Sequence, residues 1–125
     1  MQTVEIPRQS WTRQLDEFSA VHEGWLVTLE ILTPDLGARP EIVDLPLVGV
    51  SLDRGGHNDT IVVTVARTPT EHHSHPIRSA TRVFIESADD GPAAALEVES
   101  ADGSKTILRF RSTPRPETVD GIVRF

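Results

Sequence analysis

The sequence predicts a mainly antiparallel α+β fold, in which one N-terminal helix precedes a curled sheet or small barrel of about 5–7 strands. Three observations support this prediction. Residues 10–23 repeat their apolar side chains with a helical period, the residues after Gly24 alternate with a period of two, and turn-forming stretches then separate several short extended runs. Because 125 residues is the length of one ordinary domain, we expect a single domain over 1–125.

The helix is expected at about 10–23, where the apolar residues form one stripe and the charged residues fill the opposite side. Ser10 is a suitable N-cap, and Gly24 stands where a left-handed residue often ends a helix. The stripe consists of Trp11, Leu15, Phe18 and either Val21 or His22.

The strands follow as short apolar or alternating runs. The second run contains Pro46, which predicts a sheet edge or a bulge there, and Gly49, which predicts a sharp bend. The third run is β-branched and apolar on both faces, so it is expected to be the most buried strand. The stretch TPTEHHSHP is expected to be a loop, and residues 112–125 an extended C-terminal tail. The predicted strands lie at about 25–32, 41–53, 60–67, 81–87, 94–100 and 104–111.

The last two strands allow a prediction of register. A two-residue Asp-Gly loop would place Glu97 and Glu99 on the face of Leu108, which a half-buried sheet disfavours. A three-residue loop ending at Gly103 gives that residue the positive φ that glycine tolerates. We therefore expect this second register, which pairs Leu96 with Leu108, Val98 with Thr106 and Glu99 with Lys105.

Composition excludes several classes of protein. The chain has no cysteine, which removes disulfides, thiolate nucleophiles and cysteine zinc sites and is compatible with a cytoplasmic location. We find neither a signal peptide nor an apolar run near the ~20 residues that a membrane span needs, so no membrane association is expected. The formal net charge of −7 disfavours binding to nucleic acid.

The histidine-rich stretch TEHHSHP, residues 70–76, is the main candidate for chemistry. On a strand, His73 and His75 would point to the same side and could share a metal ion. His72 pairs with His75 on one face only if the segment turns helically, which Pro76 disfavours. A third ligand is missing from the stretch, and His57 from the preceding loop is the candidate to supply it. The alternative is an exposed polar loop whose histidines titrate in the ordinary way.

No other stretch indicates catalysis. Serine, histidine and aspartate occur without a nucleophile elbow, and Gly55-Gly56 lacks the ending of a phosphate loop. We expect no catalytic residue and no cofactor. His22, near the helix end, is expected to be a partner of the helix dipole or a half-buried spacer.

Several stretches together resemble a family of small uncharacterised bacterial single-domain proteins, a domain of unknown function. They are "IPRQSW", "LDEFS..HEGWLVTLEIL", "LPLVGVSLD", "H..H.I", "ALEVESADGSKTILRFRS" and "PETVDGI", with HEGW and ESADG the most specific. The resemblance implies a bacterial stand-alone protein and supplies no activity, cofactor or catalytic residue.

The function that the sequence favours is a non-enzymatic module that binds another protein or itself. The first alternative is a metal-binding protein or metal-dependent enzyme that uses the His72–His75 cluster. The second is a nucleic-acid binder of the Sm-like type, suggested by a helix followed by strands with a bend in the second. A small-molecule ligand is left open.

Overall fold

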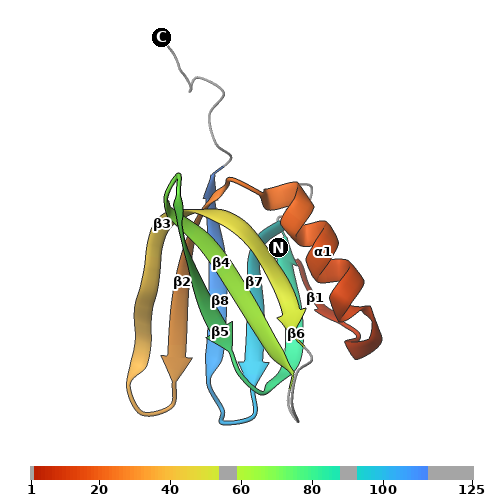
Figure 1. Ribbon diagram of the computed structural model, residues 1–125. Coiled ribbons are helices and arrows are strands. Elements are labelled where there is room, and N and C mark those ends of the chain that lie inside the picture. Colours follow the sequence, from red (N-terminus) through yellow and green to blue (C-terminus); the bar gives the residue numbers. More distant parts are fainter. Residues whose placement is uncertain (1, 54–58, 88–92, 113–125) are drawn as a thin grey trace.

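The longest strand, β3 (Gly37–Asp53), organises the molecule because its two halves belong to two layers. Its first half pairs with β2 (Leu26–Thr33), and from Leu47 onward it pairs with β4 (Thr60–Thr68). As a result, the second half of β3 and strands β4 and β5 (Glu71–Ile77) pass over the remaining strands (Figure 1). The buried side chains lie between these two layers.

The computed structural model describes residues 2–53, 59–87 and 93–112. A 3-10 turn at Arg8–Ser10 leads into the helix α1 (Trp11–His22). The strands of the described part form one sheet in the order β1-β6-β7-β8-β2-β3-β4-β5, and every neighbouring pair is antiparallel. The strands not yet introduced are β1 (Gln2–Ile6), β6 (Ala80–Ser87), β7 (Ala93–Ser100) and β8 (Lys105–Ser112).

The bend in β3 begins at a β-bulge beside β2. Val27 faces Leu45 and Leu29 faces Ile42, so two residues of β3 oppose the single residue Thr28. One of the two, Asp44, has a φ of 53°, a left-handed conformation that aspartate tolerates better than most residues. Its N–H donates to the Thr28 hydroxyl at 3.3 Å, which holds the bulge in place.

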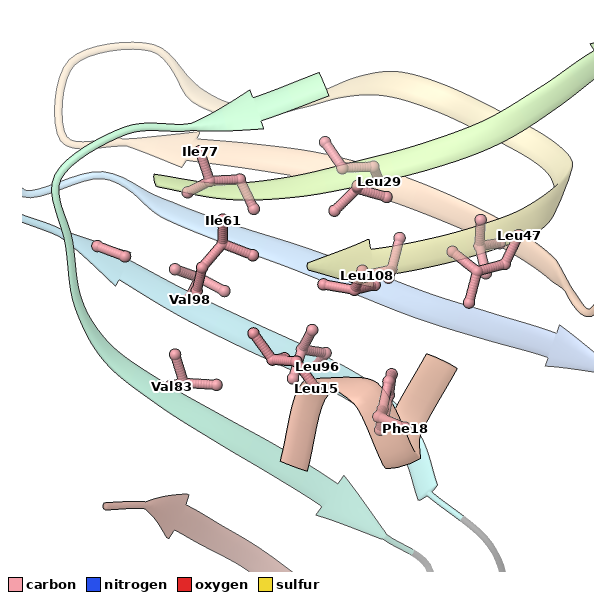
Figure 2. Packing of buried hydrophobic residues seen from close by; sticks show 14 of the residues in the cluster. Leu15, Phe18, Leu29, Leu47, Ile61, Ile77, Val83, Leu96, Val98 and Leu108 are labelled. Carbon is pink, nitrogen blue, oxygen red and sulfur yellow. The ribbon is translucent and has the colours of Figure 1, made fainter. Parts of the chain in front are cut away.

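The core is made mostly of aliphatic side chains from both layers, to which helix α1 adds Trp11 and Phe18 (Figure 2). Ile61, Val63 and Val65 of β4 are completely buried, whereas Val62 and Thr64 between them are only partly buried. The completely buried side chains pack over buried residues of β7 and β8 such as Val98 and Leu108. The burial of β4 therefore alternates along the strand: one face is completely buried and the other is partly exposed, although apolar residues stand on both.

Helix α1 covers the part of β3 that has no strand beside it. Its stripe is buried as predicted, with His22 rather than Val21 completing it. The hydroxyl of Ser19 lies 2.8 Å from both the amide nitrogen and the carbonyl oxygen of Val50. The helix therefore satisfies backbone groups on an edge of β3 that would otherwise be unpaired.

The predicted fold class is confirmed: one helix near the N-terminus accompanies a mostly antiparallel, curled sheet. The sheet is open, because β1 and β5 stand at opposite ends of the strand order. The prediction of a loop at TPTEHHSHP is wrong, since residues Glu71–Ile77 form β5. No strand was predicted before the helix, but residues Gln2–Ile6 form β1. Of the predicted tail, residues 113–125 lie outside the described residues.

The register of the last hairpin is confirmed. Leu96 faces Leu108, Val98 faces Thr106 and Glu99 faces Lys105. Gly103 has a φ of 89°, as the three-residue loop requires. The hydroxyl and the backbone N–H of Ser104 both donate to the carboxylate of Asp102 and hold the turn. Both bonds lower the pKa of Asp102, the hydroxyl bond more than the backbone bond.

Candidate functional site

Strand β5 carries the histidines that the sequence singles out. His73 and His75 face Val65 and Val63 of β4, and both imidazoles are half-buried on the core side of the sheet. His72 is exposed on the opposite side, as the alternation of a strand requires. The expectation that His73 and His75 share a face if they lie on a strand is therefore met.

Burial dominates the electrostatics of His75. Removal of the ring from water lowers the pKa of His75 from its ordinary value of 6.5. The carboxylate of Glu41, on β3, acts in the opposite direction, and the neighbouring His73 adds to the lowering. The neutral form of His75 is thus favoured, which is the form that both packs in an apolar site and binds metals.

The two imidazoles have no complete set of metal ligands around them in the part of the chain that the structure describes. No group of three or more His, Asp or Glu side chains there could hold a metal ion. His57, the expected third ligand, lies outside the described residues, which omit 54–58. Two imidazoles alone can join a metal site only if further ligands complete it.

His22 belongs to an aromatic cluster that the sequence did not reveal. Only 3% of its surface is exposed, so the expectation of a half-buried spacer is wrong. Its ring stacks on Phe110 at 4.3 Å between centroids, and the rings of Phe18 and Trp25 lie at 4.4 and 4.5 Å. The spacing of Phe18 and His22 by four residues on one helix was the available signal.

The hydrogen bonding of His22 fixes its tautomer. Nδ1 lies 2.8 Å from the carbonyl oxygen of Phe18, which can only accept, so Nδ1 carries the proton. In the neutral ring Nε2 then has a lone pair, and it has no hydrogen-bond partner among the described residues. The cluster joins the end of α1 to β8, which gives this histidine a packing role.

The outer face of the sheet is lined by paired charges. Arg82 contacts Glu5 and Glu99, while Lys105 lies near Glu97 and Glu99 at 3.9 and 3.8 Å. A further pair, Arg109 and Glu30 at 3.4 Å, lines a shallow depression of about 460 Å³ together with Thr28 and Phe110. Because each of these cations already faces a carboxylate, the depression offers little free charge to a ligand.

Within the described residues each of the two end strands has a neighbouring strand on one side only, and the two strands differ in how their other side is protected. Strand β5 contains Pro76, which has no N–H, together with the half-buried imidazoles. Strand β1 has no proline, and its first four residues, Gln2, Thr3, Val4 and Glu5, are exposed. In Figure 1, β1 lies beside β6 below α1. The Trp11 indole N–H donates to the Ile6 carbonyl at 3.0 Å, which anchors the end of the strand.

Comparisons with known proteins agree with the resemblance found in the sequence. A protein family described as "Family of unknown function (DUF5335)" matches residues 2–119. The chain is also similar to an uncharacterized protein of Aquifex aeolicus (strain VF5), with 29% identity over 118 residues that cover 94% of this chain and all of the relative. No solved structure matches the chain. No helix within the described residues is long and apolar enough to cross a membrane.

Proposed function

The chain belongs to the family of unknown function DUF5335, and we propose from its surface that it is a non-enzymatic protein-binding module that accepts a strand of another polypeptide along β1. The observation that carries the proposal is the open sheet, in which β1 pairs with β6 on one side and has no strand on its other side within the described part of the chain. Exposed sheet edges are surfaces on which extended segments of other proteins add as a further strand.

Strand β1 is favoured over β5 because it lacks the usual protection of an edge. Proteins commonly block edge strands with proline, lysine or inward-pointing charged residues. Strand β5 carries Pro76 and two half-buried imidazoles. Strand β1 carries a single charged residue, Glu5.

The charge of Glu5 is balanced within the sheet. Arg82 donates to its two carboxylate oxygens at 2.9 and 3.2 Å, and these hydrogen bonds lower the pKa of Glu5. The guanidinium carbon of Arg82 also lies 4.9 Å from the centroid of the Phe84 ring. An incoming strand would therefore meet an ion pair rather than an isolated carboxylate.

The cysteine-free sequence is compatible with this module acting in the cytoplasm.

A photo-crosslinking residue at position 4 tests the proposal in cells that express the chain. Val4 is 57% exposed on β1, and Val21, which is 62% exposed on α1, is a matched control site. We expect cross-links to a polypeptide from position 4 and few from position 21, with the cross-linked peptide identified by mass spectrometry. Equal yields from the two sites would show that β1 is not a binding edge.

The histidine pair supports a second candidate, metal binding, because His73 and His75 share one half-buried face of β5. Protein purified without an affinity tag would then contain a first-row metal in near-stoichiometric amount, and a variant with His73→Ala and His75→Ala would lose it. Elemental analysis that finds no metal in the unaltered protein contradicts this candidate.

A further inference from the structure

We propose that the strand accepted by β1 is the β1 strand of a second copy of the chain, paired antiparallel about a two-fold axis at Val4. This inference rests on the proposed function, since it assumes that β1 is a binding edge. It adds the identity of the partner and the register of the pairing.

The two faces of β1 restrict the register. Val4 and Ile6 face Ile85 and Val83 of β6 and belong to the core side, whereas Thr3 and Glu5 belong to the outer side. A two-fold axis perpendicular to the sheet continues each face into the same face of the second copy. Residues that lie directly opposite each other must then come from the same side, which leaves registers centred on Thr3, Val4 or Glu5.

Charge selects among these three registers. Centring on Glu5 places two carboxylates directly opposite each other, which is destabilising. Centring on Thr3 places Gln2 opposite Val4 and leaves Glu5 and Ile6 without opposite residues in β1. Centring on Val4 places each Glu5 opposite a Thr3 hydroxyl and uses the whole strand. The sequence Thr-Val-Glu is thus complementary to itself in one register.

Apolar contact favours the same register. Val4 is one of the large apolar side chains that remain exposed on the described surface, at 57%. In the Val4-centred pair the two Val4 side chains meet on the core side, next to the partly buried Ile85. Each copy has a net charge of −7, so repulsion opposes the approach, but salt at physiological strength screens it beyond roughly 8 Å. The association is therefore expected to strengthen with added salt.

The absence of cysteine from the chain gives a direct test, because a single introduced cysteine is the only thiol. In the Val4-centred register, Val4→Cys places two thiols opposite each other. In the same register, the thiol of a Thr3→Cys chain does not lie opposite the thiol of another Thr3→Cys chain. It lies opposite the thiol of a second chain that carries Glu5→Cys. Val21→Cys, on α1, is the control for chance collisions because it is similarly exposed. Each variant is oxidised mildly, and the disulfide-linked dimer is followed by intact mass.

We expect the Val4→Cys dimer to form at least about tenfold faster than the Val21→Cys dimer, since opposite residues of an antiparallel pair hold their Cβ atoms near disulfide distance. We also expect mixed Thr3→Cys and Glu5→Cys chains to form the heterodimer in preference to either homodimer. Equal rates at positions 4 and 21 would overturn the second copy as the partner. If photo-crosslinking at position 4 still captures another protein, the binding edge stands and only this inference fails.

Discussion

The half-buried imidazole of His75, on the edge strand β5, makes the stability of the protein depend on pH. Burial lowers the pKa of His75 in the folded chain, so the unfolded chain binds the proton more tightly. Above the ordinary value of 6.5 both states are neutral and His75 has no effect on stability. As the pH falls below 6.5 toward the lower folded pKa, the unfolded state is favoured and the free energy of unfolding decreases.

We therefore expect His75→Gln to flatten the pH dependence of urea unfolding below pH 6.5. His72→Gln is the matched control, because His72 is exposed on the other face of the same strand. Glu41→Gln should steepen the dependence, since the carboxylate of Glu41 favours the protonated form of His75. Identical pH profiles for the His75→Gln and His72→Gln variants would contradict this assignment.

Replacing two glycines by alanine should change the free energy of unfolding in opposite directions, although both glycines lie beside turns or bends. Gly103 has a φ of 89°, so alanine there is strained, and Gly103→Ala should lower the free energy of unfolding by about 1–2 kcal/mol. Gly49 is outside the left-handed region, and an added Cβ would lie 3.7 Å from Ser19 Oγ, an ordinary contact. Gly49→Ala should then raise the free energy of unfolding by about 0.4–1 kcal/mol.

Denaturant titrations of both glycine variants measure these effects directly. Destabilisation by Gly49→Ala would mean that the bend of β3 needs a backbone without a side chain at that point. The sequence predicted a bend near this residue, and a register shift between Leu47 and Gly49 lies there. The pairing of β3 with β2 has two further register shifts, one at the bulge that contains Asp44 and one between Leu29 and Glu30.

Helix α1 holds the two layers together through its buried stripe. Phe18 is 5% exposed, and its ring lies 4.4 Å from His22 and 5.1 Å from Phe110 between centroids. Phe18→Ala should therefore lower the free energy of unfolding by about 3–5 kcal/mol. Val21→Ala on the exposed side of the same helix should change it by less than about 0.5 kcal/mol. Equal denaturation midpoints for the two variants would show that the stripe does not anchor the fold.

Local patterns predicted the elements whose residues alternate or repeat clearly. The helix stripe and the hairpin between β7 and β8 are examples. In the hairpin, Leu96 and Leu108 must share the buried face while Glu97 and Glu99 stay off it, and only one register satisfies both conditions. Strand β5 was missed because its sequence, EHHSHPI, is polar and contains proline. Its strand conformation depends on pairing with β4, which is a tertiary effect that local propensity does not report.

The arrangement of strands could not be predicted, because the pairs that define it join distant parts of the chain. Strand β1 pairs with β6, and β2 pairs with β8. The same limit applies to the candidate site: the sequence indicated that His73 and His75 would share a face if they lay on a strand, but not that Glu41 of β3 influences His75. The burial of His22 likewise depends on Phe110, which is far away in the sequence.

The charge distribution of the whole molecule argues against the Sm-like alternative. The chain carries a net charge of −7, and its described cations are largely engaged by carboxylates. Arg8 contacts Asp59, Arg13 lies 3.5 Å from Glu17, and Arg82, Lys105 and Arg109 pair with glutamates on the outer face. Binding to nucleic acid requires cations that neutralise phosphates, and here most of them would first have to leave a carboxylate.

We therefore expect no binding to single-stranded RNA even at low salt, where electrostatic attraction is strongest. Fluorescence anisotropy of a labelled poly-U oligomer at 50 mM salt should stay unchanged up to about 0.1 mM protein, the weak end of non-specific affinities. A variant with Glu97→Gln and Glu99→Gln releases Lys105 from both of its carboxylates and is the informative comparison. Binding by the unaltered chain would contradict this prediction and support the Sm-like alternative. Binding by the variant alone would show that the paired glutamates are what excludes RNA from this face.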